Sequence, residues 1–520
     1  MKNIKKLLLG VIGIVFILIL TGSYLNNYNL LKKPPSETWS KEVEIGVGSG
    51  KNSPVLIKEE NRLLTAYEAS GKLKICETDL NAKVIRTVDY DIDEDFLKNM
   101  IFVKSDTGYI LMYNSSKASK GYLEKITLDK DLNLVTREII EGVDATYQAD
   151  NSNVVFSYED KLEVLNTITN KSVSVPSTKV SDLTASANKD GIQVCYIKNE
   201  SDIGTFSVKD GVASPPVLVT TLPKRKQALY NNLASSSDGK NVYILVEEWV
   251  NGAPSSTKLI EFSIAGGDAK ISKLSVNSTN YVVNAKGSYS DDGGKFYATM
   301  HTEFGKKEVQ ESIVSFEIKD GKSSNLEIVT RLSDLCIRPY ITDGYSTFLS
   351  FNKKNVYDIN IASTNQEFKN VNNEPRFIEF IRALFAMLEG VMESISYIIL
   401  IGIYWIIPIL VVGSVVTYYD YTFSNRRKQL SYIILAAMSI LLKTYIIIDT
   451  FYKTYSYMLP TIMAPISVGL TLCILIGLIV YTYGYFVYID DLECIFLGNF
   501  GIFMMIDTIL TLMIFVPLIA

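Results

Sequence analysis

Hydrophobic and polar positions divide this chain into regions of different character. Apolar residues dominate the first 25 positions and most of the chain after residue 394, whereas residues 41–372 alternate short apolar runs with polar turns. Five of the apolar stretches reach the roughly 20 residues that a helix needs to cross a bilayer. The short alternating runs, rich in Val, Ile, Tyr, Phe and Thr, are typical of strands. We therefore expect an all-β domain joined to an α-helical membrane domain.

The apolar stretches predict one N-terminal and four C-terminal transmembrane helices. Residues 1–26 form a signal anchor, and residues 27–40 a linker. Cleavage after Gly22 or Ser23 is the alternative, although no A-x-A-like site follows. Residues 395–520 form a four-helix domain, with helices at Ile395–Tyr418, Ser431–Tyr452, Ile466–Ile489 and Ile495–Leu518.

The segment 376–394 has an amphipathic pattern. At 100° per residue its charged side chains fall on one arc, which comprises Glu379, Arg382, Glu389 and Glu393. Two arrangements fit this pattern. The helix either lies on the outer membrane surface or extends the following membrane helix outward.

Basic residues predict the orientation in the membrane. The positive-inside rule makes two clusters cytoplasmic, namely Lys2, Lys5 and Lys6 near the N-terminus and Arg426, Arg427 and Lys428 between two helices. Alternation then places residues 30–375 and the C-terminus outside the cytoplasm. We expect a multi-pass protein of the cell membrane, and the composition suggests a bacterial envelope.

Charged residues inside the predicted helices form two candidate pairs. Lys443 and Asp507 lie at similar depth in two helices that run in the same direction, and a charge at this depth is costly unless it is paired. We expect them to face each other. Asp449 and Lys453 are four residues apart at the outer end of a helix, which is the spacing of a local ion pair.

One unit recurs through residues 41–372: a polar turn followed by an alternating strand. The turns lie at Asn61, Asp106, Asn151, Asp190, Asp238, Asp292 and Asp343. Their mean spacing of about 47 residues, with further short strands between them, is typical of a propeller blade. The pattern predicts an extracytoplasmic β-propeller over 41–372, with seven blades favoured over six or eight. A pair of β-sandwiches or two smaller β domains is the alternative.

Two of these turns carry a family resemblance. Ser237-Asp238-Gly239-Lys240 and Ser290-Asp291-Asp292-Gly293 resemble the turn of WD40-like propellers. The resemblance implies that each turn joins a blade's second and third strands. The Trp-Asp dipeptide of that class is absent from every unit, so the resemblance concerns the architecture and no particular family.

Composition excludes much chemistry. A net charge of −5 argues against nucleic acid as a partner, and the single histidine, His301, excludes a His-rich zinc site. None of the five cysteines forms a C-x-x-C pair. We expect no metal, no cofactor and no catalytic residues, and we predict that the protein is not an enzyme.

Three further motifs resemble sites and are read as ordinary surface. Residues 46–52 lack the first glycine and the hydroxyl residue of a phosphate loop, and we expect a flexible entry into the first blade. The alternating Asp89, Asp91, Asp93 and Asp95 lack the spacing of a calcium loop and predict a solvated acidic loop. The basic run 223–226 predicts a solvated loop between blades, with anionic envelope polymers as a speculative ligand.

These features predict an envelope protein that binds or scaffolds. The propeller captures a protein partner or ligand outside the cell, and the helices anchor it in the lipid bilayer or couple it to other membrane proteins. One alternative is an accessory subunit of a transporter, which requires a polar cavity at Lys443 and Asp507. A less favoured alternative is a propeller hydrolase, which requires paired carboxylates in a deep channel.

Overall fold

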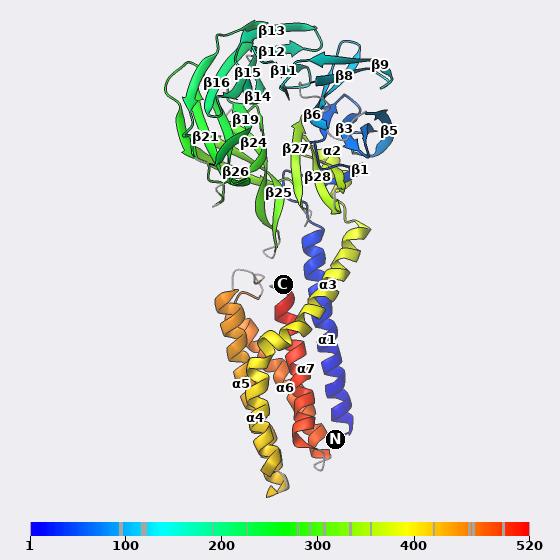
Figure 1. Ribbon diagram of the computed structural model, residues 1–520. Coiled ribbons are helices and arrows are strands. Elements are labelled where there is room, and N and C mark those ends of the chain that lie inside the picture. Colours follow the sequence, from blue (N-terminus) through cyan, green and yellow to red (C-terminus); the bar gives the residue numbers. More distant parts are fainter. Residues whose placement is uncertain are drawn as a thin grey trace. The chain divides into compact units, whose positions relative to one another are not determined.

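The computed structural model contains two compact units (Figure 1). One unit is Pro34–Phe304 with Val309–Glu374, and the other includes Met1–Lys33 and Pro375–Ala520. The structure describes residues 2–92, 97–115, 122–189, 191–225, 227–277, 279, 281–290, 293–304, 308–331, 335–353, 356–419, 422–455, 459, 463–490 and 495–518.

The first unit is a seven-bladed β-propeller, as predicted from the repeat. Each blade is one antiparallel sheet. The first three blades contain β2 (Val55–Lys58), β3 (Leu63–Ala69), β4 (Lys72–Thr78) and β5 (Val84–Asp91); β6 (Leu97–Lys104), β7 (Gly108–Ser115), β8 (Tyr122–Asp129) and β9 (Leu134–Glu141); and β10 (Ala145–Gln148), β11 (Asn153–Ser157), β12 (Lys161–Asn166) and β13 (Lys171–Pro176).

The fourth blade has an additional strand on one edge. It contains β14 (Val180–Asn188), β15 (Gly191–Lys198), β16 (Asp202–Lys209), β17 (Val212–Ala213) and β18 (Val217–Thr221). The last three blades contain β19 (Ala228–Ser237), β20 (Asn241–Val250), β21 (Ala253–Ser263) and β22 (Lys270–Lys273); β23 (Val283–Ser288), β24 (Gly294–Phe304), β25 (Glu308–Lys319) and β26 (Lys322–Ile328); and β27 (Cys336–Thr342), β28 (Tyr345–Lys353), β29 (Val356–Ser363) and β1 (Val43–Gly48).

The ring is closed by the N-terminal strand of the propeller. Strand β1 pairs antiparallel with β29, so the last blade takes its outermost strand from the beginning of the domain. The first strands of successive blades contact one another, and β27 contacts β2, so these strands surround the central channel. This closure leaves no long unpaired edge between the ends of the domain.

Hydrophobic side chains fill every space between neighbouring blades. One buried cluster joins the first two blades through Leu64, Ile75, Phe102 and Leu111. A corresponding cluster lies at each of the other blade interfaces, including the one between the seventh and first blades. The inner strands of a blade, such as β3, are therefore buried on both faces, whereas outer strands such as β5 and β9 are largely exposed.

The repeated turns occupy one position in every blade, and it differs from the one that the WD40-like resemblance implies. Ser237–Lys240 joins β19 to β20, the first and second strands of the fifth blade, whereas the resemblance places it between the second and third. The expected units therefore start one strand late, because the first strand belongs to the same blade as the turn that follows it. Asp190, Asp291 and Asp292 lie outside the described residues.

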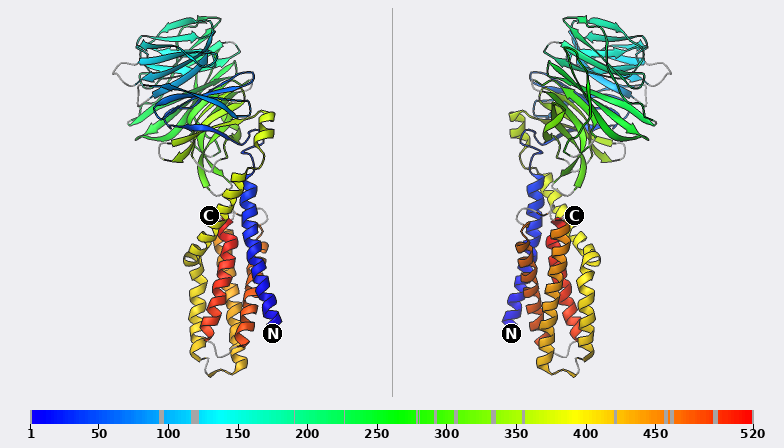
Figure 2. Two further views of the ribbon diagram at one scale, coloured as in Figure 1. Left: turned by 90° about the vertical axis from the view of Figure 1, so that its right-hand side faces the viewer. Right: turned by 90° about the vertical axis from the view of Figure 1, so that its left-hand side faces the viewer.

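The second unit is a helical bundle (Figure 2). Its helices are α1 (Lys2–Leu31), α3 (Phe377–Tyr397), α4 (Ile403–Tyr419), α5 (Asn425–Ile447), α6 (Ile466–Asp490) and α7 (Phe496–Phe515), with π-helical turns η1 (Ile398–Gly402) and η3 (Ile448–Thr454) and a final 3₁₀ turn η5 (Val516–Leu518). The short helix α2 (Gln366–Asn372) belongs to the propeller unit. Within the described residues, five helical segments are long and apolar enough to cross a membrane.

Several boundaries differ from the expected ones. Helix α1 continues through Leu31, beyond the expected end at residue 26, and α5 begins at Asn425, so Arg426 to Lys428 form its first turn instead of a loop. The segment Phe377–Tyr419 is one helical stretch of 43 residues. The amphipathic segment therefore extends the following helix. Its Glu379 is buried, and the Glu379 carboxylate accepts a hydrogen bond from the Arg376 backbone N–H.

Candidate functional site

The structure brings Lys443 of α5 and Asp507 of α7 together in the interior of the bundle. The Nζ atom of Lys443 lies 2.6 Å from Oδ1 of Asp507, and both side chains are 0% exposed. The ammonium also donates to the Cys473 backbone carbonyl and to the Thr511 hydroxyl, each at 3.1 Å. An ammonium has three N–H donors, so these three acceptors satisfy it completely.

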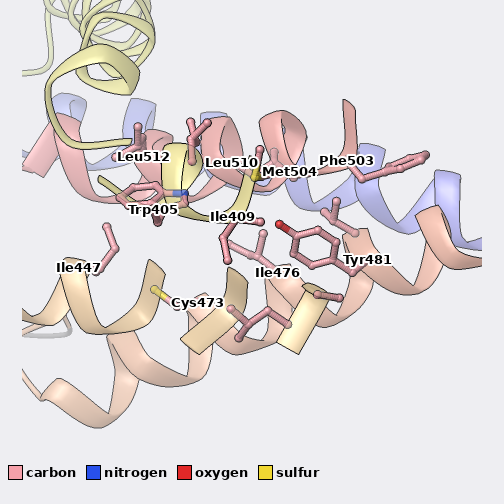
Figure 3. Packing of buried hydrophobic residues seen from close by; sticks show 14 of the residues in the cluster. Trp405, Ile409, Ile447, Cys473, Ile476, Tyr481, Phe503, Met504, Leu510 and Leu512 are labelled. Carbon is pink, nitrogen blue, oxygen red and sulfur yellow. The ribbon is translucent and has the colours of Figure 1, made fainter. Parts of the chain in front are cut away.

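Apolar and aromatic residues of the bundle form one buried cluster, part of which is shown in Figure 3. Trp405 of α4 donates to the Thr508 hydroxyl at 3.0 Å, and Tyr481 of α6 shares a 2.7 Å hydrogen bond with Ser439. Ile409 and Ile476 belong to the same buried cluster. These contacts fit a role in holding α4 to α7 together.

Glycines on α6 allow the helices to approach closely at this level. A Cβ atom on Gly477 would lie 2.5 Å from Ile440 and 3.6 Å from Nζ of Lys443. One on Gly484 would lie 2.1 Å from the Tyr432 hydroxyl. The absence of these side chains therefore provides the space that Ile440 and Tyr432 of α5 occupy.

The other charged residues predicted in the bundle lie at its surface. Asp449 and Lys453 form an exposed ion pair of 2.7 Å within η3. Lys5 of α1 forms an ion pair with Asp490 at the end of α6. Nothing is described of the Lys2 side chain, and Lys6 and the Arg426–Lys428 cluster stand near helix beginnings.

The motifs read as ordinary surface in the propeller have mixed outcomes. Gly46 and Gly48 lie in β1, the clasp strand of the seventh blade, whereas residues 49–52 lead from β1 toward β2 of the first blade. Asp89 and Asp91 lie on strand β5 and not in a loop. Asp89 forms an ion pair with Lys74 at 3.5 Å, and Asp91 forms one with Lys72 at 3.1 Å.

The remaining motifs are described only in part. Asp93 and Asp95, together with Lys226 and Cys494, lie outside the described residues. The described part of the basic run, through Arg225, is an inter-blade loop. His301 is an exposed residue of β24 that lies 3.9 Å from Glu311 and edge-on to Tyr281.

A cavity of about 220 Å³ lies in the central channel of the propeller. Every blade contributes to it through its first strand or the segment leading into it. Among the lining residues are Asn99, Tyr147, Asp182, Asn232, Asn284, Lys286, Arg338 and Tyr340. Amides, phenol rings and charges of both signs therefore converge on one concave site, which is the arrangement of a ligand pocket.

The same backbone feature brings four of these residues to the cavity. The first strands β6, β19, β23 and β27 each contain a bulge in which two residues oppose one on the neighbouring strand. The first residue of each bulge has a positive φ: 51° at Asn99, 51° at Asn232, 53° at Asn284 and 57° at Arg338. Bulges of this kind redirect side chains and occur often beside functional sites.

Two carboxylates hold the bulges of β19 and β23 in place. Asp182 of β14 accepts hydrogen bonds from its neighbour Leu183 and from Leu233 in the next blade, at 2.8 and 2.9 Å. Glu247, which is 2% exposed, accepts from Asn232 at 2.9 Å, from Trp249 at 2.8 Å and from the Asn284 backbone at 2.7 Å. Burial raises the pKa of both carboxyl groups, and their mutual repulsion contributes at Glu247.

A hydrogen bond spans the channel at the level of the repeated turns. Gln148 of the third blade donates to the Tyr340 hydroxyl of the seventh at 2.8 Å, and its other bonds are to the backbone of Phe102. Asn151 and Thr342 make a second contact across the channel, at 3.4 Å. The bulge residues Asn99, Asn232, Asn284 and Arg338 lie nearer the beginnings of the first strands. We call the part of the cavity that they line the channel mouth.

The charges at the channel mouth are not balanced. Lys286 lies over the Tyr147 ring at 4.8 Å and interacts electrostatically with Asp182. Burial lowers the pKa of Arg338, whose one favourable electrostatic neighbour is Tyr357. Within the described part of the chain, no carboxylate lies within 4.0 Å of its guanidinium.

The channel mouth was not predicted from the sequence, although recurring asparagines mark it. Three of the seven units carry an asparagine several residues before the turn, at Asn99, Asn232 and Asn284. Asparagine tolerates positive φ better than most residues, so its recurrence indicates a repeated bulge. The arginine at the equivalent position of the seventh blade can be recognised only after the first strands are aligned.

Comparisons with known proteins identify the fold and no family. No family model and no curated protein matches the chain. A virginiamycin B lyase from Staphylococcus aureus, crystallised with quinupristin, is 11% identical, with a TM-score of 0.38 over 62% of this chain and 99% of that chain. The β-propeller domain of the trilobed protease from Pyrococcus furiosus is 10% identical, with a TM-score of 0.35 over 62% of this chain and 98% of that chain.

A prolyl endopeptidase structure is also similar in the propeller. It is 11% identical, with a TM-score of 0.38, and the match covers 65% of this chain and 48% of that one, so this chain spans about half of its length. These similarities concern the fold alone.

Proposed function

We propose that this protein is a membrane-anchored receptor whose propeller binds a ligand at the channel mouth outside the cytoplasm. The observation that carries the proposal is the cavity into which all seven blades place residues, with an arginine that lacks a carboxylate partner in the described structure. Its amide groups and phenol rings provide donors, acceptors and flat apolar surfaces in a recess of limited size. These are the elements of small-ligand recognition.

Hydrogen bonding favours binding over catalysis at this site. Both oxygens of Asp182 accept backbone N–H groups, and Glu247 is enclosed by three donors. These carboxylates hold the shape of the channel mouth and have little capacity left for a substrate. Their raised pKa values nevertheless support a propeller hydrolase as a second candidate, because a general acid requires a proton near neutral pH.

The helical bundle supports the anchoring role. Five helical segments among its described residues meet the length and hydropathy of membrane spans. The contact between Lys5 and Asp490 places the beginning of α1 beside the end of α6, which agrees with both ends lying on the cytoplasmic side. In this orientation the propeller lies outside and the cluster Arg426–Lys428 lies inside.

Labelling in intact cells tests the orientation. A cysteine introduced at the exposed position Asn232 should react with a membrane-impermeant maleimide before lysis, whereas one at Arg426 should react only after lysis. The five native cysteines are replaced by serine or alanine in both variants. Equal protection of both positions in intact cells would overturn the orientation.

Site-specific photocrosslinking tests binding at the channel mouth. A photoreactive amino acid at Asn232 is compared with one at Lys240, an exposed residue at the opposite end of the same strand pair. We expect an adduct from intact cells at Asn232 alone, and we expect a variant that fills the cavity, Asn284→Trp, to prevent it. Equal adducts at both positions, or none at either, would contradict a ligand site at the channel mouth.

A further inference from the structure

Arg338 is the residue at the channel mouth whose charge the described residues leave uncompensated. The other lining cation, Lys286, has both a tyrosine ring and the carboxylate of Asp182 as neighbours. The guanidinium of Arg338 is partly removed from water, and this burial lowers its pKa. A partly buried guanidinium without an anion is unfavourable until a ligand supplies one.

The backbone at Arg338 shows that its position has a conformational cost. A positive φ of 57° is uncommon for an arginine, and the following residue is Pro339. The three equivalent bulges carry asparagine, which accepts this conformation more easily. The seventh blade thus uses the same bulge to place an arginine in the lining of the cavity, and strain of this kind is concentrated at functional sites.

The size and lining of the cavity restrict the ligand. A volume of about 220 Å³ accommodates one sugar-sized ring and a few waters. The amides of Asn99, Asn232 and Asn284 can exchange hydrogen bonds with hydroxyl groups, and Tyr147 offers a ring face. Arginine binds a carboxylate through two parallel hydrogen bonds, which a lysine cannot reproduce.

We propose that the channel mouth binds a uronic acid, with its carboxylate on Arg338 and its hydroxyl groups on the asparagine amides. The inference rests on the proposed function and names the ligand class of the same site. The acid can be a free monosaccharide or the end of an acidic glycan, because both present the same carboxylate-bearing ring.

Calorimetry on the detergent-solubilised full chain tests the proposal. The probes are D-glucuronate, D-galacturonate and a trigalacturonate, with D-glucose as the neutral match. We expect at least one acid to bind at least 10-fold more tightly than glucose. Tighter binding of the trimer than of the monomer would assign the site to a glycan end, and the reverse to a free sugar acid. Equal affinity for acid and glucose, or no heat with any probe, overturns the proposal.

The matched variant is Arg338→Asn, which places at the seventh bulge the residue found at the other three. Asparagine suits the positive φ, so we expect an unchanged or higher melting temperature together with a loss of uronate affinity of about 10-fold or more. Arg338→Lys should lose affinity too, although less than the asparagine variant. Arg225→Gln, which removes an exposed cation from an inter-blade loop, is the control and should bind as the wild type does.

The outcomes separate this inference from the proposed function. Unchanged uronate binding by a folded Arg338→Asn variant would overturn the assignment of the carboxylate to Arg338. If the uronates fail to bind while the crosslink at Asn232 persists, the ligand belongs to another class and the channel mouth remains a binding site. If both fail, the proposed function fails with the inference.

Discussion

The buried ion pair of the bundle permits a quantitative test. Replacing Lys443 by Met removes one charge and leaves Asp507 without its counter-ion in a fully buried site. Replacing Asp507 by Leu leaves the ammonium with only the Cys473 carbonyl and the Thr511 hydroxyl. Removal of one partner of a buried pair costs about 3–5 kcal/mol, because the remaining charge is uncompensated.

The double variant should behave differently from either single one. With Met at 443 and Leu at 507, no buried charge remains and the volume is nearly conserved, so the cost should be close to zero. If the two single changes were independent, their sum would instead be about 6–10 kcal/mol. The expected coupling free energy is therefore several kcal/mol in favour of the double variant.

The assay is equilibrium unfolding of the purified chain in a mixed detergent, monitored by tryptophan fluorescence in a background with Trp39 and Trp249 replaced by Phe, so that Trp405 in the bundle alone reports. All four proteins of the cycle are compared in one detergent, and an exposed pair, Asp449→Asn with Lys453→Gln, is the control. For that control we expect a coupling below about 0.5 kcal/mol. Additive costs for the buried pair would refute the reasoning, since they would show that the two charges do not stabilise each other.

Three further predictions concern packing and pH. Ile45→Ala in the clasp strand should destabilise the propeller by about 2–5 kcal/mol in urea, because Ile45 is 5% exposed, whereas Val47→Ala, at a position 43% exposed, should cost less than about 1 kcal/mol. Gly477→Ala should lower the melting temperature of the bundle, because its Cβ would lie 2.5 Å from Ile440; an unchanged value would mean that α5 and α6 can separate freely. Burial raises the folded-state pKa of Glu247 above its ordinary 4.5, so its contribution is largest below that value and is lost as pH rises through the folded-state pKa. Stability measured from pH 4 upward should therefore fall more steeply for the wild type than for Glu247→Gln, and parallel curves would contradict this assignment.

The propeller could be predicted from the sequence because its repeat is local. Each blade places an Asp, Asn or Gly turn before a strand that is buried on both faces, so the turn from Ser237 to Lys240 and its six equivalents mark one blade each. The clasp could not be predicted in this way. Strand β1 pairs with β29, more than 300 residues away, and no periodicity links two segments at that separation.

The charged residues show the same limit. Lys443 and Asp507 could be matched because helices expected to cross a membrane alternate in direction, so the position of each residue along its helix predicts its depth. Asp182 and Glu247 carried no comparable restriction, since each accepts a backbone N–H group from the bulge of a neighbouring blade. A bulge changes which side chains face the channel without changing the alternation of the strand enough to be read from sequence.

Lys443 in the bundle and Arg338 in the propeller differ in a way that bears on function. Lys443 has an anion and two further acceptors, so all its donors are occupied and a ligand would have to displace a protein group. Arg338 has no carboxylate within ion-pair distance among the described residues and adopts a backbone conformation that asparagine would adopt more easily. A satisfied charge requires no further partner, whereas an unsatisfied one is retained at a cost to stability. The cost at Arg338 is explained if the missing acceptors belong to a ligand, and for this reason we place the function in the propeller and the anchor in the bundle.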